Sequence, residues 1–482
     1  MLRSPLLLAG AAALILLGAG PAFSQDAAPD PAVELCVGAK SGVAEARLDA
    51  CNQVLKRKLD AEERSAILTI RGLVFLELDA GDRALADLMA AIRQDSRNSS
   101  AYYARAIYFT RIEDLKLAMA DIETAIRMEP EESAYLALRG DLRHRANDLN
   151  GALADYDRAI ALDPEDSDLV IDRAMIRSDA SDYAGALADY DKAIALSDQA
   201  STQVLRADLL LVLGRYDEAQ QGYDKVIARE PDFPMPYSGR ARLHQLRGDR
   251  QAAIADLDKA LSLTQGPPQD YIARGWLLYE TGEFTRARAD FDHAMALSDD
   301  DAEMILERAV FLTRIEQFDL AEADILRAAA KVPTSPAPGI ALSNLASVRG
   351  DWRRAIAEAD RSLKLAPKDP DALNQACWVR GEVKRELERA IDICSKAIAE
   401  QPDSWIALDS RSFVYFQQGN FEKALADADA ALARHPASAQ TLFLRGAVKL
   451  RLGRQAEGEA ELAAARKLHP RIDAEYGRYQ LI

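Results

Sequence analysis

One alanine recurs along this chain at a nearly constant spacing, and this periodicity constrains the fold more than any other feature. The intervals between successive copies are 33 to 35 residues, and most are 34. The series is Ala84, Ala118, Ala152, Ala186, Ala219, Ala253, Ala287, Ala321, Ala355, Ala390 and Ala424, with Gly458 in the twelfth position. Repeats of this length are structural units that bury their apolar faces only against their neighbours. The spacing therefore predicts a solenoid of about twelve units.

Each unit is expected to form two short helices. In the unit around residues 133–166, residues 135–145 and residues 151–162 have helical patterns, and a turn lies between them. Pro164 closes the unit, because proline cannot continue a helix and restricts the residue before it. Small residues at Gly140 and Ala152 allow the two helices to approach closely. The pattern predicts a helix–turn–helix hairpin.

The repeats resemble the tetratricopeptide repeat family. The resemblance is clearest in residues 151–164 (GALADYDRAIALDP) and residues 419–432 (GNFEKALADADAAL), which match the second helix of that repeat. It extends over residues 65–472, about 85% of the chain. The resemblance implies an all-α, right-handed superhelical solenoid of about twelve helix–turn–helix repeats. It also implies a scaffold that binds proteins, since the family serves mainly in that role.

The predicted organisation follows from the repeat boundaries. The segments are a signal peptide (1–24), a degenerate N-terminal capping half-repeat (25–64), repeats one to eight (65–335), repeats nine to twelve (336–472) and a C-terminal cap (473–482). The division near residue 335 is expected because Pro336, Pro338 and Gly339 stand where a first helix should begin. Residues 331–340 are either a hinge or the site of a shortened helix that does not move.

The first 24 residues have the layout of a secretory signal. Arg3 precedes an apolar run over residues 5–17, and small residues stand at both sides of a cut before Gln25. A retained membrane anchor is the alternative, but the run is shorter than the ~20 residues that a spanning helix needs. We expect an exported protein, most simply in a bacterial periplasm, with no stable transmembrane segment after processing.

Composition and motifs exclude several function classes. The chain has 77 acidic and 60 basic residues, for a net charge of −17, whereas general nucleic-acid binding needs a basic face. Its five histidines lie in different repeats without a metal-binding spacing. No nucleophile motif, phosphate loop or dinucleotide pattern occurs. The sequence predicts no catalytic residue, no metal and no cofactor, and it leaves the oligomeric state open.

An arginine and an acid also recur with the period of the repeat. Arg139 on a first helix and Asp155 on the following second helix illustrate the pair, which nearly every repeat contains. A functional ladder of charges is one interpretation. Recurrence in almost every copy favours a structural ion pair or hydrogen bond within each hairpin.

The four cysteines fit local disulfides. Cys377 and Cys394 are 17 residues apart, in facing positions of one hairpin. Cys51 occupies the same second-helix position in the N-terminal half-repeat, and Cys36 lies 15 residues upstream. Four cysteines allow three connectivities, and export implies an oxidising compartment. We favour Cys36–Cys51 with Cys377–Cys394 over free buried thiols. Redox activity is not indicated, because no Cys-x-x-Cys motif occurs.

First helices line the inner face of such a solenoid, and that face is the expected partner site. By family resemblance, the predicted groove residues are Ile272, Trp276, Tyr279, Leu306, Val310, Phe413, Phe416 and Phe443. The first three share one helical face, apart from the stripe that carries the core. An exposed apolar patch often marks a partner site. The alternative is that neighbouring helices cover these residues.

Together these features predict a non-enzymatic protein–protein interaction scaffold in the cell envelope. Its partner would be an extended segment or helix of another envelope protein, bound in the concave groove. The alternative is an accessory factor for assembly or export of an envelope glycan. In that case Trp276 and Tyr279, with acidic neighbours, would stack on sugar rings.

Overall fold

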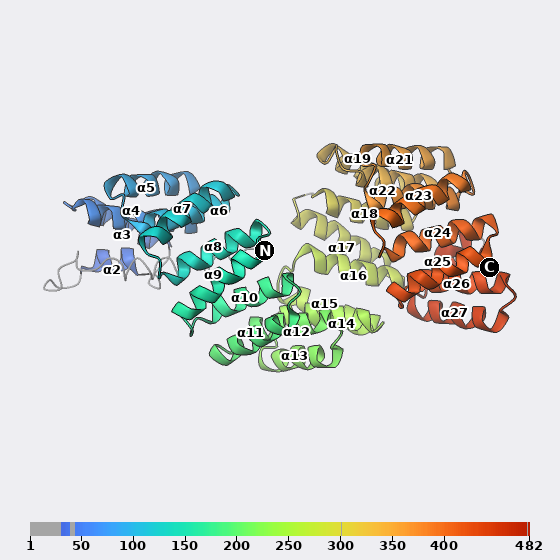
Figure 1. Ribbon diagram of the computed structural model, residues 1–482, viewed down its shortest axis with the longest axis horizontal. Helices are drawn as coiled ribbons and strands as arrows, with labels where there is room; N and C mark the ends of the chain where they lie inside the picture. Colours follow the sequence, from blue (N-terminus) through green and yellow to red (C-terminus); the bar gives the residue numbers. More distant parts are fainter. Residues whose placement is uncertain (1–29, 39–43, 300, 480) are drawn as a thin grey trace. The chain divides into compact units, whose positions relative to one another are not determined.

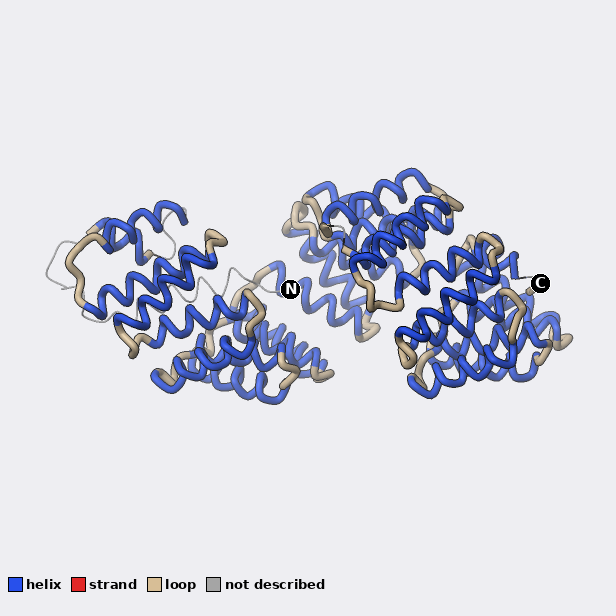
Figure 2. Tube along the Cα trace, turned by 90° about the horizontal axis from the view of Figure 1, so that it is seen from above, coloured by secondary structure: helices blue, strands red, loops and turns tan. Residues whose placement is uncertain are grey.

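The computed structural model describes residues 30–38, 44–299, 301–479 and 481–482. The predicted signal peptide, residues 1–24, lies outside the described residues. Within them the chain consists of helices joined by short turns, and no strand occurs there (Figure 2). No described helix combines the length and the apolar composition that crossing a membrane requires.

Helices α4 to α27 follow one another as twelve helix pairs within the described residues (Figure 1). The helices are α2(Pro31–Val37), α3(Ala44–Leu55), α4(Ala61–Glu77), α5(Gly81–Gln94), α6(Ser99–Arg111), α7(Leu115–Met128), α8(Ser133–Arg145), α9(Leu149–Leu162), α10(Ser167–Asp179), α11(Tyr183–Leu196), α12(Ala200–Val212), α13(Tyr216–Arg229), α14(Met235–Leu246), α15(Arg250–Leu263), α16(Pro268–Thr281), α17(Phe284–Leu297), α18(Ala302–Arg314), α19(Phe318–Lys331), α20(Ala337–Val348), α21(Trp352–Leu365), α22(Pro370–Glu382), α23(Leu387–Glu400), α24(Trp405–Gln418), α25(Phe421–Arg434), α26(Ala439–Arg451), α27(Gln455–Leu468) and α28(Ile472–Tyr476), followed by the 3₁₀ turn η1(Gly477–Tyr479). The predicted all-α repeat fold is confirmed.

The hairpin of α8 and α9 shows how the local sequence produces each unit. Asn147 takes a left-handed backbone conformation (φ 61°), which turns the chain between the helices. Asp148 then caps α9, accepting a hydrogen bond from the Gly151 amide at 3.0 Å. At the centre, a Cβ on Gly140 would lie 2.7 Å from the ring of Tyr156. Glycine is therefore required where the two helices pack most closely.

The chain forms two compact units that meet between Gly222 and Tyr223, inside α13. This boundary follows the single one-residue deletion in the repeat spacing, just before Tyr216, and Gly222 stands where most hairpins place an acid. The Pro-rich joint at residues 331–340 lies inside the second unit, where α20 packs against α18 and α19. Both interpretations of that joint, a hinge and a shortened helix that does not move, stay predictions.

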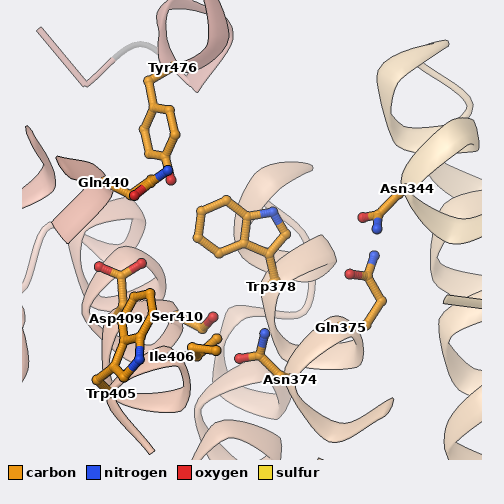
Figure 3. Close-up of a pocket in the computed structure, with 10 residues that line it drawn as sticks. All are labelled: Asn344, Asn374, Gln375, Trp378, Trp405, Ile406, Asp409, Ser410, Gln440 and Tyr476. Carbon is orange, nitrogen blue, oxygen red and sulfur yellow. The ribbon is translucent and has the colours of Figure 1, made fainter. Parts of the chain in front are cut away.

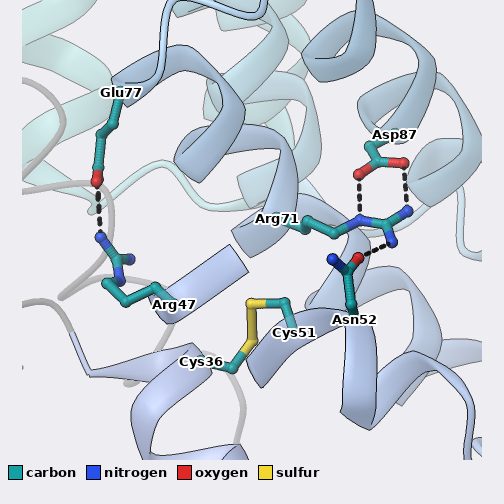
Figure 4. Close-up of a disulfide and its surroundings, with 7 residues drawn as sticks. All are labelled: Cys36, Arg47, Cys51, Asn52, Arg71, Glu77 and Asp87. Carbon is teal, nitrogen blue, oxygen red and sulfur yellow. Dashed lines mark hydrogen bonds and ion pairs between the residues drawn. A yellow bond between two sulfur atoms is a disulfide. The ribbon is translucent and has the colours of Figure 1, made fainter. Parts of the chain in front are cut away.

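The described part of the N-terminal cap contains the short helix pair α2 and α3. The Cys36–Cys51 disulfide joins α2 to α3, and both cysteines are fully buried (Figure 4). Arg47 on α3 is also buried, and it donates to Glu77 on α4 at 2.9 Å. The cap is therefore fixed internally by a covalent bond and attached to the first repeat by an ion pair.

The recurrent arginine and acid form the same paired hydrogen bonds in most hairpins. In the hairpin of α8 and α9, Arg139 Nε and Nη2 donate to the two oxygens of Asp155 at 2.9 and 2.5 Å. The other pairs are Arg71–Asp87 (Figure 4), Arg105–Asp121, Arg173–Asp189, Arg240–Asp256, Arg274–Asp290, Arg308–Asp324, Arg411–Asp427 and Arg445–Glu461. The aspartates of these pairs are buried. We call these units the ladder hairpins.

Several of these arginines also reach the preceding hairpin. Arg173 Nη1 donates to Asp157 on α9 at 2.7 Å, and Arg274 Nη1 donates to Asp258 on α15 at 2.8 Å. Each such arginine therefore stabilises its own hairpin and its contact with the previous one. The contacts support the structural interpretation of the repeated pair over a functional ladder.

The C-terminal segment, residues 472–479 and 481–482, packs onto first helices of the last three hairpins. Ile472, Tyr479 and Leu481 are buried. The ring of Tyr479 lies 5.6 Å from that of Trp378 on α22 and 5.3 Å from that of Phe413 on α24. The segment was expected to cap the last hairpin, and its contacts extend to α22 and α24 as well.

Candidate functional site

Three of the predicted groove residues in the last two hairpins are not available to a partner. Phe413, Phe416 and Phe443 are at most 6% exposed. Phe413 stacks on Trp378 with ring centroids 4.4 Å apart, and the C-terminal segment covers it. Tyr476 of the same segment packs against Phe443 at 5.8 Å. Their prediction as exposed groove residues is wrong, because the chain's own C-terminus and neighbouring rings bury them.

Tyr279 is buried for a related reason. Its hydroxyl donates to Glu475 at 3.3 Å, and the guanidinium of Arg471 lies 4.9 Å from the centre of its ring. Glu475 also pairs with His469 at 3.1 Å and Arg314 at 3.3 Å. Burial would raise the pKa of Glu475, but these partners hold it below its usual value. The C-terminal segment is thus anchored on α16 and α18, where Tyr279 no longer faces solvent.

Ile272, Trp276, Leu306 and Val310 are partly exposed on α16 and α18. Trp276 is held by an edge-to-face contact with Phe291 at 5.1 Å. These four residues remain predicted partner contacts. They do not line the groove described next.

A groove with a volume of about 290 Å³ is lined by residues of α20, α22, α24, α26 and α28 (Figure 3). Its lining residues are Asn344, Asn374, Gln375, Trp378, Trp405, Ile406, Asp409, Ser410, Gln440 and Tyr476. Four carboxamides and three large aromatic rings dominate the lining, and we call it the amide groove. Sequence reasoning did not identify these residues as a site.

A signal for the amide groove was nevertheless present in the repeat register. Asn344 occupies the position of Trp276 two repeats earlier, and Asn374 and Asp409 occupy the position of Ile272. Amides and an acid therefore appear among these positions from α20 onward, beside aromatic residues such as Trp378 and Phe413. A search for apolar stripes could not find it, because these inner positions carry amides and an acid.

The groove's side chains are held in place before any ligand arrives. The Gln375 amide donates to the hydroxyl of Ser343 at 3.0 Å, in a buried contact. The ring of Trp405 stacks on His435 with centroids 4.6 Å apart. Trp378 is fixed by the aromatic contacts described above. Fixed side chains reduce the entropy that a ligand must overcome on binding.

Asp409 on α24 is the one charged residue in the lining. It is 7% exposed, and its buried Oδ1 atom has no hydrogen-bond partner among the described residues. Burial raises the pKa of its carboxyl to about 6, although the Thr441 hydroxyl opposes this shift. Asp427, one helix later, is equally buried but accepts two hydrogen bonds from Arg411. Asp409 has no comparable counter-charge.

The hairpins of α20–α21 and α22–α23, whose first helices line part of the groove, lack the recurrent arginine–acid pair. Leu342 and Ala376 stand at the arginine position of α20 and α22. Arg380, fully buried on α22, instead donates to Asp360 at 2.8 Å and to Glu386 at 3.0 Å. The arginine has moved one helical turn along α22, and its partners have changed with it.

The second disulfide belongs to the same hairpin. Cys377 on α22 is bonded to Cys394 on α23, with Cα atoms 5.4 Å apart. Both predicted cysteine pairings are therefore present in the structure. Cys377 precedes Trp378 in the sequence, so the disulfide fixes the backbone from which this groove residue projects.

The side chains of the groove are suited to binding a ligand. Carboxamides offer both donors and acceptors, and the aromatic rings offer apolar faces. Over the described part of the chain, no group of three or more acidic, histidine or cysteine side chains is arranged to hold a metal ion.

A comparison with protein families identifies the repeats. The sequence profile of the family described as Tetratricopeptide repeat matches residues 103–167, 204–270, 272–336 and 414–471, together just over half of the chain. No curated protein sequence matches the chain significantly.

Solved structures similar to the chain are also built from such repeats. A tetratricopeptide repeat protein of Parabacteroides merdae has 21% identity and a TM-score of 0.45, over 52% of this chain and 99% of its own. Yeast Tom70 has 16% identity and a TM-score of 0.45, over 86% of this chain and 95% of its own. Pseudomonas aeruginosa PilF has 21% identity and a TM-score of 0.39, over 46% of this chain and 99% of its own.

Proposed function

Because this chain belongs to the tetratricopeptide repeat family, we propose that it is an exported, non-enzymatic scaffold that binds an extended segment of another envelope protein. We place that segment in the amide groove, not on the buried aromatic residues. The composition of the groove carries this proposal.

An extended peptide leaves its backbone N–H and C=O groups unpaired, so a binding surface must supply both acceptors and donors. Asn344, Asn374 and Gln440 can do so from three different first helices. Trp378 and Trp405 add apolar surface beside them for the segment's side chains. A volume of about 290 Å³ suits a few residues of a peptide rather than a folded domain.

Two disulfides support the exported location within this proposal. Disulfides persist in oxidising compartments and are rare in the cytosol. Each bridge closes a short loop, of 15 and 17 residues, inside one helix pair. An exported protein would retain both bonds as permanent parts of the fold.

Site-specific photo-crosslinking in cells tests the groove. A crosslinking amino acid replaces Asn344 or Gln440 in the full chain, and Lys396, exposed on the second helix α23, serves as the control position. We expect both groove positions to capture the same segment of one envelope protein, and Lys396 to capture none of it. The variant Trp405→Ala should abolish the groove crosslinks. Equal capture from all three positions, or no effect of Trp405→Ala, would overturn the proposal.

An accessory role in envelope glycan assembly or export is the second candidate. Aromatic faces and carboxamides also suit sugar rings and their hydroxyls, and the amide groove holds both. Tyr279 is buried, so the amide groove replaces Trp276 and Tyr279 as the proposed sugar site. Binding of the purified protein to arrayed envelope oligosaccharides, lost in Trp405→Ala and unaccompanied by peptide crosslinks, would favour this role.

A further inference from the structure

The amide groove holds a buried acid that nothing in the described structure neutralises. Asp409 is 7% exposed, and among the described residues it has a hydrogen bond from Thr441 but no basic partner. Buried acids elsewhere in the second unit, such as Asp256, Asp290 and Asp427, each accept two hydrogen bonds from an arginine. Burying an unpaired charge is costly, and a fold accepts that cost most often at functional sites.

The unpaired atoms identify the missing chemistry. Oδ1 of Asp409 and Oδ1 of Asn374 are both buried without a hydrogen-bond partner, and both residues line the groove. An ionised carboxylate and a carboxamide oxygen only accept hydrogen bonds. The group that completes the site must therefore be a donor. In a low-dielectric site, a positively charged donor forms a stronger hydrogen bond with a carboxylate than a neutral donor does.

Three aromatic rings line the groove together with this acid (Figure 3). Trp405 lies one helical turn before Asp409 on α24, and Trp378 and Tyr476 line the same groove. Burial and the nearby charge of Asp409 raise the pKa of Tyr476 well above its usual value, so its phenol stays neutral. Cations are attracted to the electron-rich faces of such rings.

We propose that the amide groove binds a cationic side chain, a guanidinium or an ammonium group, at Asp409 beside the rings of Trp378, Trp405 and Tyr476. This proposal rests on the proposed function and specifies which partner segments the groove accepts. The carboxylate pairs with the cation, the rings contact its flanks, and the carboxamides bind the backbone of the segment. The net charge of −17 favours a basic segment over an acidic one at long range.

The proposal also predicts how binding depends on pH. Burial raises the pKa of Asp409 to about 6, and only the ionised form can pair with a cation. Affinity should therefore rise as the pH increases through 6. The Thr441 hydroxyl on α26 hydrogen-bonds this carboxyl and the Tyr476 phenol on α28 lies near it, and neither group titrates in that range.

Labelled peptide pools test the proposal by fluorescence polarisation with the full exported chain. Each pool is randomised on both sides of a fixed central residue, which is arginine, lysine, neutral citrulline or glutamate. We expect the arginine or lysine pool to bind about tenfold or more tightly than the citrulline pool, as one desolvated charged contact implies. Asp409→Asn should remove this preference. Asp403→Asn, which removes the same charge from a fully exposed position, should not.

The outcomes separate this proposal from the proposed function. If all pools bind equally and Trp405→Ala abolishes their binding, the groove binds peptides and the cationic subsite is wrong. If no pool binds, or Trp405→Ala has no effect, the groove assignment is wrong as well. A cation preference that survives in Asp409→Asn would overturn the role of this carboxyl.

Discussion

The ladder hairpins and the two hairpins of α20–α23 stabilise the same helix pairing by different means. A ladder hairpin joins its helices through an arginine and a buried aspartate, and several of these arginines also bind the preceding hairpin. In α20 and α22, Leu342 and Ala376 replace that arginine. The hairpin of α22 and α23 relies on the disulfide and on the fully buried Arg380.

This difference shows where function can reside in a repeat protein. A residue present in every copy maintains the stack and cannot distinguish one part of the surface from another. The amide groove lies where the copies diverge, and its unpaired acid stands at an inner-face position that holds Ile272 in an earlier repeat. Four predictions test whether the two kinds of hairpin are stabilised and used differently.

Substitution of Arg380 should cause the largest loss of stability. This side chain is fully buried and donates to Asp360, Glu386 and the Ala376 carbonyl, so Arg380→Ala removes these bonds and leaves a cavity. We expect a loss of about 3–5 kcal/mol in unfolding free energy, as for the truncation of other large buried side chains. Tryptophan fluorescence during denaturant unfolding reports on this unit alone, because all four tryptophans lie in it.

Arg389 provides the matched control for Arg380. It binds the same two acids from a position that is 55% exposed. Exposed pairs contribute about 0–1 kcal/mol, so Arg389→Ala should change little. Equal losses in both variants would show that burial is not what distinguishes Arg380.

Removing the Cys377–Cys394 disulfide should have the next largest effect. The double variant Cys377→Ala with Cys394→Ala should lose about 3 kcal/mol, because the bond closes a loop of 17 residues. The equivalent Cys36/Cys51 variant should leave the tryptophan transition unchanged, since its bridge lies in the other unit. A shift of that transition in the Cys36/Cys51 variant would contradict the independence of the two units.

Asp409→Asn should stabilise the protein at neutral pH. Burial raises the pKa of Asp409 from 3.8 to about 6, so the folded chain binds more protons than the unfolded chain between these values. Stability contributed by this group therefore falls as the pH rises from about 4 to 6 and stays low above that range. The variant should gain about 2 kcal/mol at pH 7.5 and nothing near pH 4. Urea unfolding at several pH values measures this, and a less stable variant at pH 7.5 would contradict it.

Of the four predictions, a substitution in a ladder hairpin should have the smallest effect on the free energy of unfolding. Asp155→Asn keeps the shape of the side chain but weakens its bonds with Arg139 and Arg143. Because these arginines are 18% and 29% exposed, we expect a loss of only about 1–2 kcal/mol. Thermal unfolding by circular dichroism measures it. Asp157→Asn, at a side chain that is 58% exposed, is the control and should change less.

Much of the fold was predictable from the sequence, because repetition supplies the same information many times. Ala152 and Gly140 specify the close contact within one hairpin, and their equivalents do so in the others. The spacing also placed both cysteine pairs correctly. The unit boundary was missed, although the deletion before Tyr216 and the loss of the acid at Gly222 coincide with it.

The site was predictable only in part. The register placed these residues on one face of the first helices, but it did not indicate which of them remain accessible. Phe413 and Phe443 occupy inner positions and are covered by the C-terminal segment, whereas Asn374 and Asp409 line a groove. Apolarity was the wrong criterion, because an apolar inner residue can equally be covered by the chain itself.

The sequence alone determined the helices, their pairing, the ladder and the disulfides, because each depends on residues close together in the chain. Tertiary structure decided what covers the inner face. Glu475 meets Tyr279 across 196 residues, and no repeat spacing encodes that contact. The stacking of many hairpins sets where the C-terminal segment lies, and its position leaves the amide groove accessible to a partner while covering the aromatic residues beside it.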